Sequence, residues 1–304
     1  MSPDALSVTL RALAFFALFQ AVGATLFLAL FARRLNAARA AVRRLALAAA
    51  ACAALFTLAH HGLEAARMAG DYSGLWDSDL QQLAWWSRSG QAPITEVVGL
   101  LILLASLWWL PVRTALPGAS AGGVLVLCGF LLTGHTSAHA WRAVLAPLLG
   151  LHLLIVAFWF GALWPLLVVV RLEAASIAAQ IVARYSTLAG YLVPLIAVAG
   201  LTMAWILTGE RTILRQPYGK LLAFKLVLFV LLMAPAAYNR WRLVPALTAA
   251  TAGAGTALRR SIAMEFLLIA IALTVTAALT TLYSPHGPAD SQALAAQMAA
   301  ATAA

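Results

Sequence analysis

Five of the six histidines in the chain lie within or at the ends of long apolar segments. They are His60, His61, His135, His139 and His152. The four-residue spacing of His135 and His139 predicts that both imidazoles share one face of a helix. Imidazole binds copper, zinc, iron and nickel, and polar side chains inside a membrane are costly unless they have a function. Some subset of these histidines is therefore predicted to form a metal or haem site.

Two methionines and two glutamates could complete such a site. Met68 and Met203 would add thioether ligands, which select Cu(I), although methionine is also a common packing residue. Glu64 lies one helical turn after His60, and Glu96 could accept a hydrogen bond from a ligating imidazole. Alternatively, the histidines serve only to join neighbouring helices through hydrogen bonds.

Two further charged residues, Lys225 and Glu265, lie inside other apolar segments. Their expected depths differ too much for the two side chains to pair. We expect Glu265 to pair with Arg240 or Arg242, and Lys225 to extend outward or to pair with an acid on a neighbouring helix. A role for Lys225 in repelling or gating cations is the alternative.

The elements that position these residues are predicted to be membrane-spanning helices. The chain is 63% hydrophobic and only 10% charged, whereas soluble chains are about 25% charged. Eight apolar stretches have the length of about 20 residues that crosses a bilayer. They are 7–32, 45–69, 93–111, 119–139, 145–170, 189–208, 218–238 and 261–283. Because a span must satisfy its own backbone hydrogen bonds, we predict an all-α bundle of about eight transmembrane helices.

The arrangement of these spans predicts one membrane domain, residues 1–283, followed by a disordered periplasmic tail, residues 284–304. The first apolar segment lacks the basic start and the cleavage site of a signal peptide. We expect the outer loop 70–92 to lie on the membrane surface. The mildly amphipathic stretch 174–188 is expected to form a surface helix on the opposite side.

The distribution of Lys and Arg predicts the orientation in the membrane. Arginines gather in the loops after the first, third, fifth and seventh spans, which makes that side cytoplasmic and places both chain ends in the periplasm. The net charge of +10 is then a consequence of topology and does not indicate nucleic-acid binding. No P-loop is present, so we expect no nucleotide partner. All five histidines would lie in the outer third of the bilayer.

Four stretches of the second half resemble the CopD family, the copper resistance protein D membrane domain. They are LHLLIVAFWFGALWPLL, ARYSTLAGYLVPLIAVAGL, YGKLLAFKLVLFVLLMAPAAYNRWRLVP and LRRSIAMEFLLIAIALTVTAALTTLYSP. Upstream, TGHTSAHA resembles the histidine-bearing helix end of that family. The likeness is strongest from 145 to 285, and the first three spans match mainly in hydropathy and in the loop MAGDYSG.

This resemblance implies a copper-handling protein of the bacterial inner membrane, working beside a periplasmic CopC-like copper-binding protein. Matched by position, His135 and His152 resemble the membrane histidines of the family, and His139, His60 and His61 match less closely. Copper, as Cu(I) or Cu(II), would be the cargo of a transporter rather than the substrate of an enzyme.

Two other hypotheses stay open on the residues alone. Two imidazoles facing across a helix bundle could hold haem b, which would make the chain a membrane electron-transfer protein or metalloreductase. The chain could instead be a structural or sensory membrane partner without bound metal.

Overall fold

The computed structural model describes residues 2–133, 139–207 and 216–283. Within them, eight helical segments are long and apolar enough to cross a membrane. These segments are Pro3–Phe31, Ala38–Ala69, Gly90–Trp109, Val112–Leu132, Arg142–Leu172, Ala175–Leu207, Pro217–Thr248 and Ala254–Leu282. The predicted fold class and the predicted number of spans are confirmed.

The long helices are α1 (Pro3–Phe31), α2 (Ala38–Gly62), α5 (Arg88–Trp109), α6 (Val112–Leu132), α8 (Arg142–Leu172), α9 (Ala175–Leu207), α10 (Pro217–Tyr238) and α12 (Ala254–Leu282). Four short helices extend or connect them: α3 (Glu64–Ala69), η1 (Tyr72–Leu75), α4 (Ser78–Trp86) and α11 (Val244–Thr248). A π-helical turn, η3 (Asn239–Leu243), joins α10 to α11.

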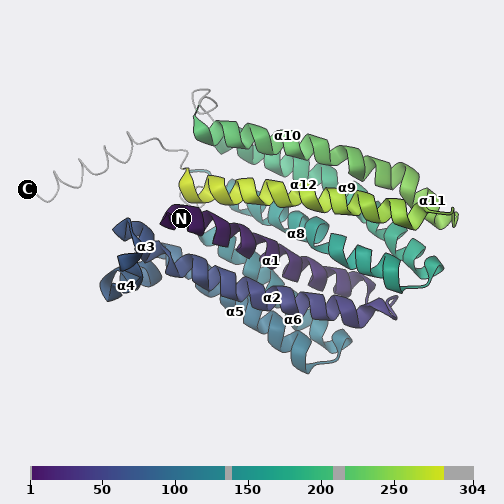
Figure 1. The fold of residues 1–304 in the computed structure, drawn as a ribbon, viewed down its shortest axis with the longest axis horizontal. Helices are drawn as coiled ribbons and strands as arrows, with labels where there is room; N and C mark the ends of the chain where they lie inside the picture. Colours follow the sequence, from purple (N-terminus) through teal and green to yellow (C-terminus); the bar gives the residue numbers. More distant parts are fainter. Residues whose placement is uncertain (1, 134–138, 208–215, 284–304) are drawn as a thin grey trace, which may run out of the picture.

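Helices α1 and α8 lie at the centre of the bundle. Helices α2, α5 and α6 form one flank, and α9, α10 and α12 form the other (Figure 1). In the most apolar stretch of α1, 72% of the residues are buried, against 11% in the span that begins with α10. The first helix is therefore a core element, and α10 presents most of its apolar surface to the surroundings.

The contact between α1 and α8 is a close approach of two backbones. A Cβ atom added to Gly23 would lie 2.0 Å from the carbonyl oxygen of Ala157 and 2.5 Å from Cα of Gly161. In addition, Nε2 of Gln20 donates a hydrogen bond of 2.8 Å to the carbonyl of Gly161. Small residues permit such contacts between membrane helices, and this one holds α8, which carries His152, against the core.

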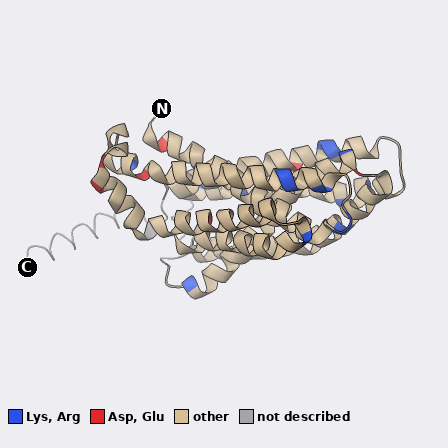
Figure 2. Ribbon diagram, turned by 90° about the horizontal axis from the view of Figure 1, so that it is seen from below, with Lys and Arg blue, Asp and Glu red and all other residues tan. Residues whose placement is uncertain are grey.

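Charged residues are divided between the two ends of the bundle. Most Lys and Arg lie at one end, and Asp and Glu gather at the end where α1 begins (Figure 2). The start of α1 and the end of α12 lie at that same end (Figure 1). Both ends of the described chain thus lie on one side, as an even number of spans requires. That this side is periplasmic stays a prediction.

The segment between α3 and α5 forms two short helices at the acidic end. Its N-terminal caps are aspartates: the carboxylate of Asp71 accepts a hydrogen bond of 2.7 Å from the backbone N–H of Ser73, and Asp77 accepts from Asp79 and Leu80. Hydrogen bonds from Ser73 lower the pKa of Asp71 below its usual value. Contact of this segment with the membrane surface stays a prediction.

The predicted surface helix at 174–188 is wrong. The structure has one continuous helix, α9, from Ala175 to Leu207. Ala178, Ile181, Val182 and Tyr185 on this stretch are buried in the core. The apolar face that made the stretch look amphipathic packs against other helices of the bundle, and no helix break separates it from the span that follows.

Candidate functional site

The predicted histidines do not form one cluster in the part of the chain that the structure describes. No group of three or more His, Cys, Asp or Glu side chains within residues 2–133, 139–207 and 216–283 is arranged to hold a metal ion. His60, His61 and His152 occupy three different environments. His135 lies outside the described residues.

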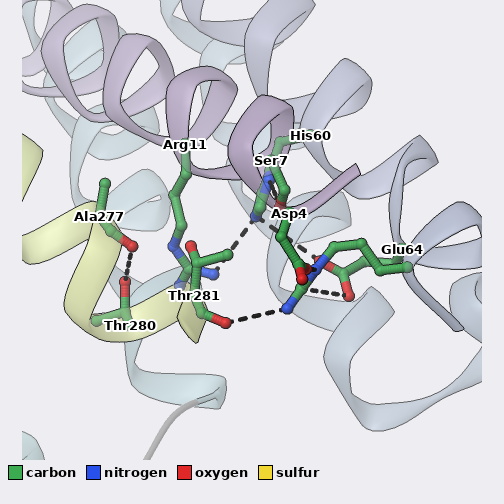
Figure 3. Close-up of polar contacts among 9 residues, drawn as sticks. Asp4, Ser7, Arg11, His60, Glu64, Ala277, Thr280 and Thr281 are labelled. Atoms are coloured by element: carbon green, nitrogen blue, oxygen red, sulfur yellow. Dashed lines mark hydrogen bonds and ion pairs between the residues drawn. The ribbon is translucent and has the colours of Figure 1, made fainter. Parts of the chain in front are cut away.

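His60 joins α2 to α1 through both of its ring nitrogens. Nδ1 lies 3.1 Å from Oγ of Ser7, and Nε2 lies 3.4 Å from Nη1 of Arg11 (Figure 3). A guanidinium can only donate hydrogen bonds, so Nε2 of His60 is the acceptor. In the neutral imidazole, Nδ1 then carries the proton and donates it to Ser7. Neither nitrogen of His60 has a lone pair free for a metal in this arrangement.

Glu64 is bound by Arg67 and does not face an open metal position. Nη1 of Arg67 donates to both oxygens of Glu64, at 2.9 and 3.0 Å. Nε of Arg67 donates to Asp4 at 2.9 Å, and its Nη2 donates to the carbonyl of Thr281 at 3.0 Å. Arg67 therefore ties α3 to the start of α1 and the end of α12.

The polar residue that sequence analysis missed is Arg11. It lies in α1, with Cζ 5.5 Å from the centre of the Phe15 ring. Its Nε is buried and has no hydrogen-bond partner among the described residues. Glu96, which packs over Gly129 of α6, interacts electrostatically with Arg11. Arg11 could have been identified from the sequence, because it is a charged residue inside the first apolar segment.

His61 faces away from His60, as the rotation of about 100° between helix neighbours requires. Its ring forms an edge-to-face contact with Trp85 of α4, with centroids 4.4 Å apart. It is buried, with only 5% of its surface exposed. Nε2 of His61 is buried and has no hydrogen-bond partner within the described part of the chain.

His152 lies where α8 meets α9. Its ring packs against α9, where a Cβ atom added to Gly200 would lie 3.4 Å from Cε1 and 3.5 Å from Nδ1 of His152. Nδ1 of His152 is buried and finds no hydrogen-bond partner in the described residues. Met203 is buried and follows Gly200 by three residues, so both lie on the same face of α9. Lys225 on α10 is close enough to interact electrostatically with His152.

The prediction that His139 lies on a helix is wrong. Helix α6 ends at Leu132, because Thr133 has the extended backbone angles φ −131° and ψ 168°. His139 lies beyond this end, in a bend, and His135 lies outside the described residues. Its Nδ1 accepts a hydrogen bond of 3.0 Å from the backbone N–H of Trp141. Met68, on α3, is 50% exposed and is also separate from the other candidates.

The predicted ion pair of Glu265 with Arg240 or Arg242 is wrong as well. Instead, Glu265 accepts a hydrogen bond of 3.1 Å from Nε1 of Trp159, and a second from Nδ2 of Asn239. Arg240 donates to a backbone carbonyl of α9. The π-helical turn η3 changes the register after α10, which brings Asn239 to α12 and directs Arg240 toward α9.

Two models of known families match the chain. Residues 1–144 match the model described as "Copper resistance protein D-like, N-terminal domain", and residues 179–279 match "Copper resistance protein D". The chain belongs to the copper resistance protein D family. There is no significant match to a curated protein or to a solved structure.

Membership in the copper resistance protein D family confirms the resemblance and extends it. The first three spans, which resembled the family mainly in hydropathy, lie within the matched N-terminal domain. The match to the second model includes Met203, Lys225 and Glu265. The family associates this multi-pass membrane protein with copper and with copper resistance.

Proposed function

We propose that this chain transports copper across, or handles it at, the bacterial inner membrane, and that copper passes a site built around His152. Family membership supports copper as the cargo. The buried Nδ1 of His152, which has no partner among the described residues, supports the location. A buried polar atom without a hydrogen bond costs about 1–3 kcal/mol, and each such atom in a native structure calls for an explanation, such as a ligand.

The surroundings of His152 suit copper chemically. A neutral imidazole nitrogen is a good copper ligand, and the thioether of Met203 would favour Cu(I). Gly200 leaves the ring edge of His152 uncovered by a larger side chain. His135, which precedes α8 by a short connection, is the candidate for a third ligand.

The other described histidines have different proposed roles. His61 also keeps a buried nitrogen without a partner in the described residues, so it is a candidate for an additional outer position. His60 is engaged at both ring nitrogens, and we assign it to joining α1 and α2. His139 accepts from Trp141 and would have to give up that hydrogen bond to bind copper through Nδ1.

Lys225 would limit how long copper stays beside His152. An ammonium group near a cation site repels the bound ion, because like charges in a medium of low dielectric constant interact strongly. Transport requires a site that binds well enough to fill and weakly enough to empty. Lys225 therefore fits a transport site better than a storage site.

Copper content of the purified protein tests the proposal. Cells are grown with copper, and copper and iron are counted per chain for the natural protein and for the variants His152→Ala and Met203→Leu. We expect both variants to lose copper and His152→Ala to abolish the cellular copper accumulation that the natural protein produces. His286→Ala, in the segment after α12, is the matched control. It should keep both the bound copper and the cellular copper accumulation. Unchanged copper in His152→Ala would contradict the proposal.

Among the described residues, no observation favours the haem b alternative. Haem would need two imidazoles facing each other across the bundle, whereas His60, His61 and His152 contact different helices. The same elemental analysis, together with an absorption spectrum, decides between copper transport and the haem b alternative. Stoichiometric iron and a Soret absorption band would indicate a redox protein.

A CopC-like periplasmic protein is the proposed copper donor or acceptor. The segment around α4 offers it acidic and aromatic residues. Asp77 and Asp79 lie at the start of α4, and Trp76, before the helix, and Trp86, at its end, are 88% and 86% exposed. Exposed aromatic residues of this kind are common in protein interfaces. Loss of binding to a purified CopC-like protein in Trp76→Ser would support this docking surface, and unchanged binding would argue against it.

A further inference from the structure

A basic cavity lies at the end of the bundle opposite to the candidate copper site. Its volume is about 500 Å³, and it lies between the first turns of α2, the end of α5 and the start of α6. Its lining includes Asn36, Arg39, Arg43, Arg44, Trp108 and Val112. Figure 2 shows that the Lys and Arg residues gather at this end. None of the copper-site candidates lines the cavity.

The three arginines of the cavity have no neutralising partner in the described part of the chain. None of Arg39, Arg43 and Arg44 forms an ion pair there, and no carboxylate lines the cavity. Nε of Arg39 is buried without a hydrogen-bond partner among the described residues. Such a concentration of positive charge is stabilised when an anion binds to it.

Arg43 has a structural task in addition to its charge. Its Nε donates to the carbonyl of Leu107 at 2.7 Å, and its Nη2 donates to the carbonyl of Trp108 at 3.1 Å. These bonds satisfy carbonyls at the end of α5 that have no partner within that helix. They hold α2 against α5 and thereby fix the walls of the cavity.

Glu173, an acidic residue bound to the backbone beside the cavity residue Asn36, is engaged in capping α2. Oε1 of Glu173 accepts hydrogen bonds from the backbone N–H groups of Asn36, at 2.8 Å, and Ala38, at 2.9 Å. It therefore caps the start of α2, which has no side-chain cap from its own N-cap residue, Ala37. Among the described residues, no carboxylate therefore neutralises the guanidinium groups of the cavity.

We propose that this cavity binds the phosphate group of an anionic phospholipid. Guanidinium groups match phosphate oxygens in charge and in geometry, and basic pockets between transmembrane helices bind lipid head groups. Trp108 is 67% exposed and Trp109 is 76% exposed, which places the end of α5 at the membrane interface, where lipid phosphates lie. Leu47 and Val112 supply apolar walls beside the arginines, which an acyl chain can contact and a free phosphate ion cannot use.

Lipid titration of the purified protein tests the site. The detergent-solubilised full chain is titrated with phosphatidylglycerol, with phosphatidylcholine of the same acyl chains, and with inorganic phosphate. Thermal unfolding and native mass spectrometry report binding. We expect phosphatidylglycerol to raise the unfolding temperature and to be retained, and the other two to do neither. An equal shift with phosphatidylcholine, or an equal shift with inorganic phosphate alone, would overturn the lipid assignment.

Matched charge variants test the location of the site. The double variant Arg39→Gln, Arg44→Gln removes two arginines of the cavity. The double variant Arg33→Gln, Arg34→Gln removes two exposed arginines that precede α2 and do not line the cavity. Losing charge-assisted hydrogen bonds to phosphate should weaken phosphatidylglycerol binding about tenfold in the first variant and much less in the second.

An equal loss in both double variants would show general electrostatic attraction to the membrane and would overturn the site. If Arg39→Gln disturbs folding, Arg44→Gln alone serves, because Arg44 is exposed. Arg43 is left intact because it holds the helices together. Since none of these measurements involves copper, their outcome is independent of the proposed copper transport.

Discussion

The guanidinium Nη1 of Arg11 lies 3.4 Å from Nε2 of His60, and Arg11 thereby occupies the lone pair that a metal would need. The other ring nitrogen of His60 is 3.1 Å from Oγ of Ser7. His60, which was predicted as a metal ligand, is thus hydrogen-bonded to a cationic side chain of the protein itself. This relationship separates His60 from His152, whose Nδ1 has no partner among the described residues.

His60→Ala is expected to reduce stability without changing copper content. The substitution leaves Ser7 and Arg11 without their partner, and an unsatisfied buried polar group costs about 1–3 kcal/mol. Thermal unfolding in detergent and elemental analysis measure the two effects. A variant that keeps its unfolding temperature but loses copper would show that His60 is a ligand.

Gly161→Ala is expected to disrupt the contact between α1 and α8. The added Cβ would lie 2.4 Å from the carbonyl oxygen of Phe19 and 2.5 Å from Cα of Gly23, so the helices must separate. Overpacking of this kind costs about 1–3 kcal/mol. Thermal unfolding and size-exclusion chromatography of the purified variant measure the effect.

Gly62→Ala is the matched control for that substitution. A Cβ atom at Gly62 meets no atom within 4 Å, and alanine is a better helix former than glycine. We expect this variant to be as stable as the natural protein or slightly more stable. If both variants lost similar amounts of stability, the close contact between α1 and α8 would not explain the need for glycine at position 161.

Trp159→Phe is expected to destabilise the bundle through Glu265. The indole N–H donates to Oε2 of Glu265 at 3.1 Å, and without it the buried carboxylate keeps, among the described residues, only the hydrogen bond from Asn239. Hydrogen bonds to charged groups contribute about 1.5–3 kcal/mol. A double-mutant cycle with Glu265→Leu isolates this pair, and thermal unfolding supplies the four stabilities. Strictly additive effects would contradict the coupling.

Lys225→Met is expected to strengthen copper binding. Removing a positive charge near His152 removes its repulsion of the bound cation, and about tenfold tighter binding corresponds to 1.4 kcal/mol. Competition with a Cu(I) chelator measures the affinity. Lys220→Met is the control, because Lys220 is exposed in the first turn of α10. Equal affinities of the two variants would remove Lys225 from the proposed site.

The class of protein and its spans could be predicted from the sequence because they depend on local composition. A segment of about 20 apolar residues in a chain of low charge has few alternatives to a membrane helix. All eight predicted spans are present, and the resemblance to the CopD family is confirmed by the family matches. The spacing of His60 and His61 also predicted correctly that the two rings point in different directions.

The partners of individual side chains could not be predicted because they lie on other helices. Glu265 was assigned to arginines close to it in expected depth, but the π-helical turn brings Asn239 to it instead. His139 was assigned to a helix that ends at Leu132, because the backbone becomes extended at Thr133. Arg11 was overlooked inside an apolar segment, although its charge was visible.

The sequence by itself therefore determined the membrane class, the number of membrane spans and the family. These properties depend on the hydropathy and residue order of each segment and not on contacts between segments. Only the tertiary structure decided which histidines keep a free nitrogen. That depends on packing between helices far apart in the chain: α1 supplies the groups that engage His60, whereas α9 leaves Nδ1 of His152 without a partner among the described residues.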